Sequence, residues 1–118
     1  MLRLFDVVWV FDLTTAPQKR KMFVCLSFDD GWYLRINTKP VPKPSVPVTK
    51  ARNPFLDHDS HVECALLEVD DYEIAEAIRR GGVVGRLSLW HRQAIAEGIR
   101  RAPYIRQRDK DRIAALLG

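Results

Sequence analysis

The sequence predicts an α+β fold that is mainly β: a small antiparallel barrel or curled sheet followed by C-terminal helices. Three observations lead to this class. Strand-forming segments occupy the first part of the chain, and helical periodicity begins only near residue 70. An Asp-Gly pair marks a tight turn between two of those segments. The length of 118 residues suits one domain over 1–118, with its helical part at 70–118.

Several segments are rich in the β-branched and aromatic residues that favour strands. In the first segment, apolar side chains at alternate positions from Phe5 to Phe11 share one face. In a later segment, Val62, Cys64 and Leu66 share a face in the same way. The expected strands cover residues 4–12, 22–28, 32–38, 61–69 and, as a short last strand, 83–87.

Two connections in this β-rich part have distinctive compositions. Asp29-Asp30-Gly31 predicts a hairpin, because tight turns of this kind need a residue with positive φ. Residues 39–54 hold five of the seven prolines. Since proline removes a backbone donor, we expect an extended, stiff loop there rather than a central strand. A loop of this length in so small a domain is usually functional or disordered.

Helical periodicity predicts helices at 72–80, 89–101 and 110–117. Asp70 or Asp71 can cap the first helix, Ser88 the second and Asp109 the third.

The composition is typical of a globular protein, and the lack of an export signal leads us to expect a cytosolic one. No apolar run reaches the length of a membrane span, and we find no export signal. Cys25 and Cys64 lie in apolar segments, so we expect reduced core cysteines.

The net charge of +4 is unevenly distributed. Residues 1–56 carry nine Lys/Arg against four Asp/Glu, residues 57–98 carry four against nine, and residues 99–118 carry six against two. Basic regions suit a polyanion such as nucleic acid, but they equally suit an acidic protein partner or simple solubility.

The basic cluster Lys19-Arg20-Lys21 stands at the mouth of an expected strand. A cation there could stabilise charge developing on an RNA phosphate, and Thr38 and Lys39 are candidates to stand beside it. No metal is required when the 2′-hydroxyl is the nucleophile. The cluster is also compatible with a solvated strand edge that discourages aggregation.

Two further groups of residues have open interpretations. Residues 57–61, DHDSH, are either a polar turn or an RNA-contacting segment. A metal site is not expected, because His61 and Cys64 would point to opposite faces of a strand. Trp32 and Tyr33 are either core residues or a stacking surface for bases.

Several segments resemble the PemK/MazF family of toxin ribonucleases. DVVWVFDL is similar to the family's opening strand, KRKMFVCLS to its second strand and RINTK to the end of its third strand. HDSHVECALLEV and GRLSLWHRQAIAEGI are similar to a later strand and a final helix. The resemblance implies a small SH3-like barrel with C-terminal helices. It also implies a homodimer, inhibited by an antitoxin protein, that cleaves single-stranded RNA without metal or cofactor in the cytoplasm.

By this resemblance, Arg20 or Lys21 is the phosphate-stabilising cation and Thr38, or Asn37 in another register, is the catalytic partner. The remaining substrate-binding candidates are Lys19, Asn37, Lys39, His58, Ser60 and His61. Phe5 stands where the family has its opening glycine, and Arg20-Lys21-Met22 replaces the family's arginine-proline pair. The alternative function is a non-catalytic SH3-like module that binds nucleic acid or an acidic protein; turnover of RNA distinguishes the two.

Overall fold

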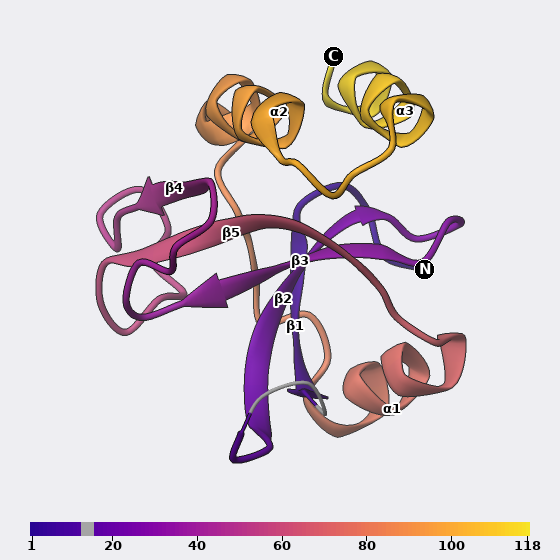
Figure 1. Cartoon of the computed structure of the whole chain (residues 1–118). Coiled ribbons are helices and arrows are strands. Elements are labelled where there is room, and N and C mark those ends of the chain that lie inside the picture. Colours follow the sequence, from indigo (N-terminus) through magenta and orange to yellow (C-terminus); the bar gives the residue numbers. More distant parts are fainter. Residues whose placement is uncertain (13–15) are drawn as a thin grey trace.

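A computed structural model of the chain describes residues 1–12 and 16–118. Antiparallel strands form one sheet in the order β4-β5-β3-β2-β1-β6, curled into a half-barrel whose two edge strands do not meet (Figure 1). The fold class expected from the sequence is therefore confirmed. The strands are β1 (Asp6–Asp12), β2 (Lys19–Ser27), β3 (Trp32–Asn37), β4 (Ser45–Val48), β5 (Ser60–Glu68) and β6 (Gly85–Arg86).

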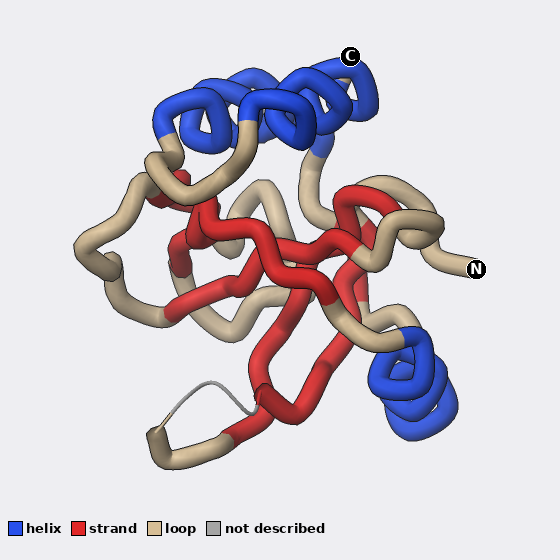
Figure 2. The backbone as a smooth tube through the Cα atoms, turned by 45° about the vertical axis from the view of Figure 1, so that its right-hand side comes forward, coloured by secondary structure: helices blue, strands red, loops and turns tan. Residues whose placement is uncertain are grey.

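The helices lie on two sides of this sheet (Figure 2). Helix α1 (Asp71–Gly81) packs against β1, while α2 (Arg92–Arg101) and α3 (Gln107–Leu117) lie side by side on the opposite face. A 3₁₀ turn (Leu89–His91) precedes α2. Among residues 1–12 and 16–118, no helix has the length and hydrophobicity that crossing a membrane requires.

Strand β1 is apolar on both faces because each face is covered by helices. Val7 belongs to the larger core, which lies between the sheet and helices α2 and α3. Its neighbour Val8 belongs to a smaller core beneath α1. Both side chains are fully buried. A strand covered on both faces reads as a continuous apolar run, which is what the sequence shows.

The predicted hairpin between β2 and β3 is confirmed. Gly31 has φ 71°, a conformation that glycine adopts without strain. Ser27 donates from its hydroxyl to the Asp30 carboxylate at 2.6 Å, and Arg112 of α3 reaches the same carboxylate at 2.7 Å. The turn is therefore tied to the last helix of the chain.

Helix α2 approaches β5 closely because both contribute a small residue at their contact. A Cβ atom placed on Gly98 would lie 2.4 Å from the Cys64 sulfur. Both cysteines are reduced and buried, as expected. Burial raises the pKa of the Cys25 thiol to about 12 and that of Cys64 to about 11, so both thiols stay protonated.

Three expectations need correction. The segment 39–54 is not loop throughout, because β4 forms inside it. As an edge strand, β4 has a neighbour on one side only, so the missing N–H of Pro47 breaks no hydrogen bond to a second strand. Strand β2 starts at Lys19 rather than residue 22, because β1 extends alongside it as far as Asp12. Asp109 does not cap α3; it lies in the first turn, where its carboxylate faces Arg106 and Arg108.

Candidate functional site

A depression of about 230 Å³ opens where β3 ends between the first residues of β2 and of β5. The antiparallel register brings these ends together, since β3 pairs with β2 on one edge and with β5 on the other. The segment before β5 closes one side. The lining residues are Trp9, Lys19, Arg20, Lys21, Met22, Ile36, Thr38, Asp57, His58 and Ser60. Six of them are residues that the sequence nominated for chemistry or substrate binding.

Arg20 and Lys21 point their charges to opposite faces of the sheet. Because the basic cluster lies inside β2, successive side chains alternate between faces. The Arg20 guanidinium lies over the Trp9 ring, 5.5 Å from its centroid, beside the depression. Lys21 also lines the depression, but its ammonium donates to the Asn37 amide oxygen at 3.2 Å on the other face. The geometry therefore favours Arg20 as the cation that would contact a ligand in the depression.

His58 and Ser60 form a small local network at the rim. Ser60 donates from its hydroxyl to the His58 carbonyl at 3.0 Å. The Nδ1 atom of His58 lies 3.3 Å from the Ser60 hydroxyl oxygen and 3.3 Å from the Asp59 carbonyl. With Thr38 also in the lining, two hydroxyls, an imidazole and a guanidinium border the same depression. These groups can bind a phosphate and move a proton beside it.

Glu63 organises the neighbouring face of the sheet, and sequence reasoning missed it. Its carboxylate is buried and accepts from Asn37 at 3.0 Å and from Arg35 at 3.1 Å, while Lys43 lies 3.1 Å from its other oxygen. Burial alone would raise the pKa of Glu63, but these donors and cations outweigh burial and lower it. Glu63 is therefore ionised, and it fixes the Asn37 amide that holds Lys21.

Strand alternation was the one sequence signal for Glu63, because it places this residue opposite the apolar face of Val62 and Cys64. The partners of its carboxylate lie far away along the chain, so no local sequence motif predicts them.

Some predicted site residues lie elsewhere. Asn37 is buried in the Glu63 network, and His61 is paired with it across β3 and β5. Lys39 is exposed beyond the end of β3 and does not line the depression. Within the described residues, no three His, Cys, Asp or Glu side chains are grouped as a metal site would require.

The stacking surface considered for Trp32 and Tyr33 is absent, because both rings are buried. Trp32 packs in the core beneath α2 and α3, and Tyr33 packs beneath α1. Other aromatic rings among the described residues are accessible. Trp9 is half-buried in the depression, and Trp90 is exposed under the Arg52 guanidinium, 3.9 Å from its centroid. The exposed rings away from the depression also include Phe11, Tyr72 and Tyr104.

Comparisons with known proteins identify no relative: no protein-family model, no curated protein and no solved structure matches this chain.

Proposed function

We propose that this protein is a metal-independent endoribonuclease of the toxin type, which cleaves single-stranded RNA. One observation carries the proposal: Arg20, Thr38, His58 and Ser60 line a single depression on a basic part of the sheet. A cation, hydroxyl donors and a group able to accept a proton are the components that cleavage through the 2′-hydroxyl needs.

In the proposed reaction the RNA supplies its own nucleophile. The 2′-oxygen attacks the adjacent phosphorus, and its proton passes to the His58 imidazole, which lies beside the depression. The P–O5′ bond breaks, and the leaving oxygen takes up a proton from water, while the protonated His58 returns its proton to the solvent. The products are a 2′,3′-cyclic phosphate and a 5′-hydroxyl. Arg20 stabilises the extra negative charge on the phosphate, and Thr38 donates to one of its oxygens.

The resemblance to the PemK/MazF family adds support beyond the depression itself. Phe5 stands at the position of the family's opening glycine, and it has φ 69°, a conformation that favours glycine. By the same resemblance we infer a homodimer whose activity an antitoxin protein blocks.

Single variants separate the roles of the two neighbouring cations. We expect Arg20→Ala to lower the rate of RNA cleavage by about 100-fold or more, because it removes the charge at the phosphate. Lys21→Ala should cost less than about tenfold, since its ammonium serves the opposite face. Arg20 is exposed, so we expect its variant to remain folded. Circular dichroism and the thermal midpoint check this for both variants.

Unchanged cleavage in the double variant Arg20→Ala/Lys21→Ala would contradict the proposed site. If the native protein binds single-stranded RNA but never cleaves it, the non-catalytic binding module replaces the enzyme as the function.

A further inference from the structure

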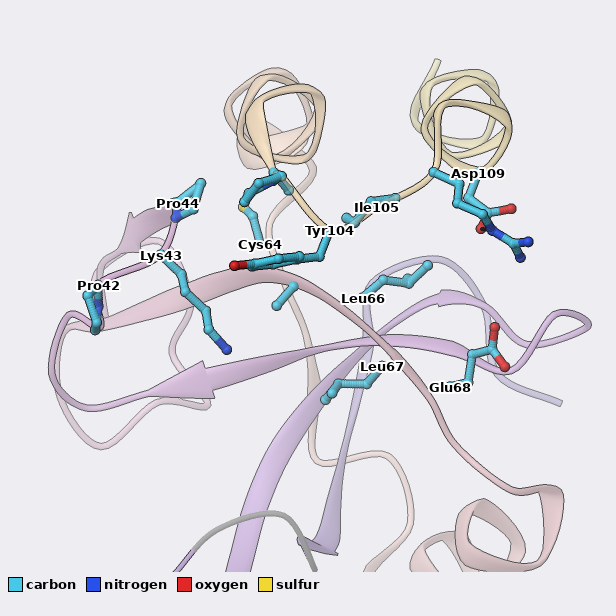
Figure 3. Close-up of a pocket in the computed structure, with 14 residues that line it drawn as sticks. Pro42, Lys43, Pro44, Cys64, Leu66, Leu67, Glu68, Tyr104, Ile105 and Asp109 are labelled. Carbon is cyan, nitrogen blue, oxygen red and sulfur yellow. Dashed lines mark ion pairs between the residues drawn. The ribbon is translucent and has the colours of Figure 1, made fainter.

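A groove of about 700 Å³ lies under Tyr104, away from the basic depression. Its floor is the second half of β5, and its roof is the segment between α2 and α3 (Figure 3). The charged side chains that line it are two of each sign, and both cations are already paired: Lys43 with Glu63, and Arg106 with Asp109. The groove under Tyr104 therefore does not select a ligand by its charge.

A buried histidine, His91, lies where a turn after β4 meets the start of α2. The turn spans residues 49–53 and is closed by a bond from the Asn53 N–H to the Thr49 carbonyl at 3.0 Å. The Asn53 side chain is fully buried, and its amide nitrogen lies 3.1 Å from Nε2 of His91. The ribonuclease chemistry proposed above uses neither of these two side chains.

The bonds of the Asn53 amide fix the state of the His91 ring. Its Oδ1 atom accepts from the Ser88 N–H at 2.8 Å, and its Nδ2 atom donates to the Thr49 carbonyl at 2.8 Å. Turning the amide over would place donor against donor and acceptor against acceptor, so these backbone groups allow one orientation. The second N–H of Nδ2 then faces His91 and needs an acceptor. Nε2 is therefore unprotonated, and the neutral ring carries its proton on Nδ1.

A proton on Nε2 of His91 would turn this acceptor into a donor that faces the N–H of Asn53. Among the described residues, burial and the charge of Arg52, in that order, act on the ring, and both lower its pKa. The charged residues of the two segments and of the helix start are all cations: Lys50, Arg52 and Arg92. No carboxylate of these segments stabilises a protonated ring.

The turn continues into one wall of the basic depression. The Leu56 N–H donates to the Asn53 carbonyl at 3.0 Å, and the Leu56 side chain is buried. The Lys50 N–H donates to the Asp59 carboxylate at 2.9 Å. Three residues of the same segment line the depression: Asp57, His58 and Ser60. Contacts that hold residues 49–53 in place therefore also hold this wall.

We propose that His91 is an acid-sensitive latch, which ties the segment of residues 49–60 to the start of α2. While Nε2 is unprotonated, it accepts from Asn53 and the two segments stay together. When Nε2 takes up a proton, two donors face each other, the Asn53 amide parts from Ser88 and His91, and the wall that carries His58 loosens. The latch is a property of the fold and does not depend on cleavage of RNA.

The direction of the pH dependence follows from the neutral state of the folded ring. The pKa of His91 is lowered in the folded protein from its ordinary value of 6.5, so the unfolded chain binds the proton more readily. The stability that His91 contributes is fully present above 6.5, and it is lost as the pH falls from 6.5 through the lower folded pKa. Down to about pH 5, Glu63 stays ionised because its own pKa lies below 4.5.

Nuclear magnetic resonance on the native full chain tests the latch directly. At pH 7.5 the ring nitrogen shifts of His91 should show an unprotonated Nε2. Between pH 7.5 and about pH 5, hydrogen exchange at the Ser88 amide should accelerate about fivefold or more after correction for the intrinsic effect of pH. The Val69 amide, which donates to the Gly31 carbonyl, is the control and should not accelerate. A proton on Nε2 at pH 7.5, an unchanged Ser88 amide or equal acceleration at both amides would overturn the proposal.

A pair of variants separates His91 from the other histidines. His91→Gln keeps an acceptor for the Asn53 amide but does not titrate. From pH 7.5 to about pH 5, its urea midpoint should fall less than that of the native protein. His58→Gln, which removes an exposed histidine of the same segment, should fall as the native protein does. An equal fall in His91→Gln and native protein would refute the latch, and if His91→Gln does not fold, the resonance measurements on the native chain decide.

Discussion

At the residue scale, Glu63 is the side chain that connects the fold to the candidate site. Its carboxylate fixes Asn37, and Asn37 in turn holds the Lys21 ammonium on the face opposite Arg20. A buried carboxylate with several donors favours folding only while it is ionised. The network therefore makes stability depend on pH.

The pKa of Glu63 is lowered in the folded protein from its ordinary value of 4.5. The stabilisation from its charge is present above this ordinary value, and it is lost as the pH falls through the lower folded pKa. At pH 7, Glu63→Gln should lower the free energy of unfolding by about 1–3 kcal/mol. Near pH 3 the difference between Glu63→Gln and the native protein should shrink.

Urea denaturation at the two pH values measures this difference. Glu97→Gln is the control, because Glu97 is an exposed carboxylate paired with Arg100 and its loss should have little effect. A stability loss for Glu63→Gln that is the same at both pH values would show that packing, rather than charge, makes this residue important.

Single residues differ in how far the sequence predicts them. Alternation along β5 placed Val62 and Cys64 in the core, and it also placed Glu63 on the other face. What alternation cannot supply is the partner set, because Arg35 and Asn37 come from β3, many residues earlier. The sequence also left open whether Arg20 or Lys21 is the phosphate-stabilising cation. Their side chains alternate between faces only because β2 begins at Lys19, and that start depends on pairing with β1.

At the element scale, packing of α2 on β5 depends on the absence of a side chain at Gly98. We expect Gly98→Ala to lower the free energy of unfolding by about 1–3 kcal/mol, because its Cβ would overlap the Cys64 sulfur. Gly81→Ala is the matched control: a Cβ there meets nothing within 4 Å, so the change should be neutral or stabilising.

Thermal or urea unfolding of the two alanine variants measures the contrast, and adding Cys64→Ala to Gly98→Ala should recover part of the loss. If Gly98→Ala proves as stable as Gly81→Ala, the close contact between α2 and β5 does not exist in solution.

Elements with a strong local pattern were predicted well, and those that depend on neighbours were not. The hairpin at Gly31 follows from local turn chemistry, and α1 follows from its cap at Asp70 and its periodicity. Strand β4 contains a proline and forms only because β5 offers an edge to pair with, so local composition indicated a loop. The start of β2 likewise depends on the length of β1.

At the scale of the whole molecule, the half-barrel separates two surfaces. The depression with Arg20 and Thr38 opens at the ends of β2 and β3, and the groove under Tyr104 runs along β5. The uneven charge seen in the sequence contributes to both: basic residues of the first half reach the depression, and the basic tail borders the groove.

The measurement that tests the central claim most directly is incubation of the purified native protein with end-labelled single-stranded RNA in excess EDTA. The proposed site predicts discrete fragments that end in a 2′,3′-cyclic phosphate, formed without metal and lost in Arg20→Ala/Lys21→Ala. RNA that stays intact for hours in the presence of folded protein would contradict the ribonuclease and leave a binding module in its place.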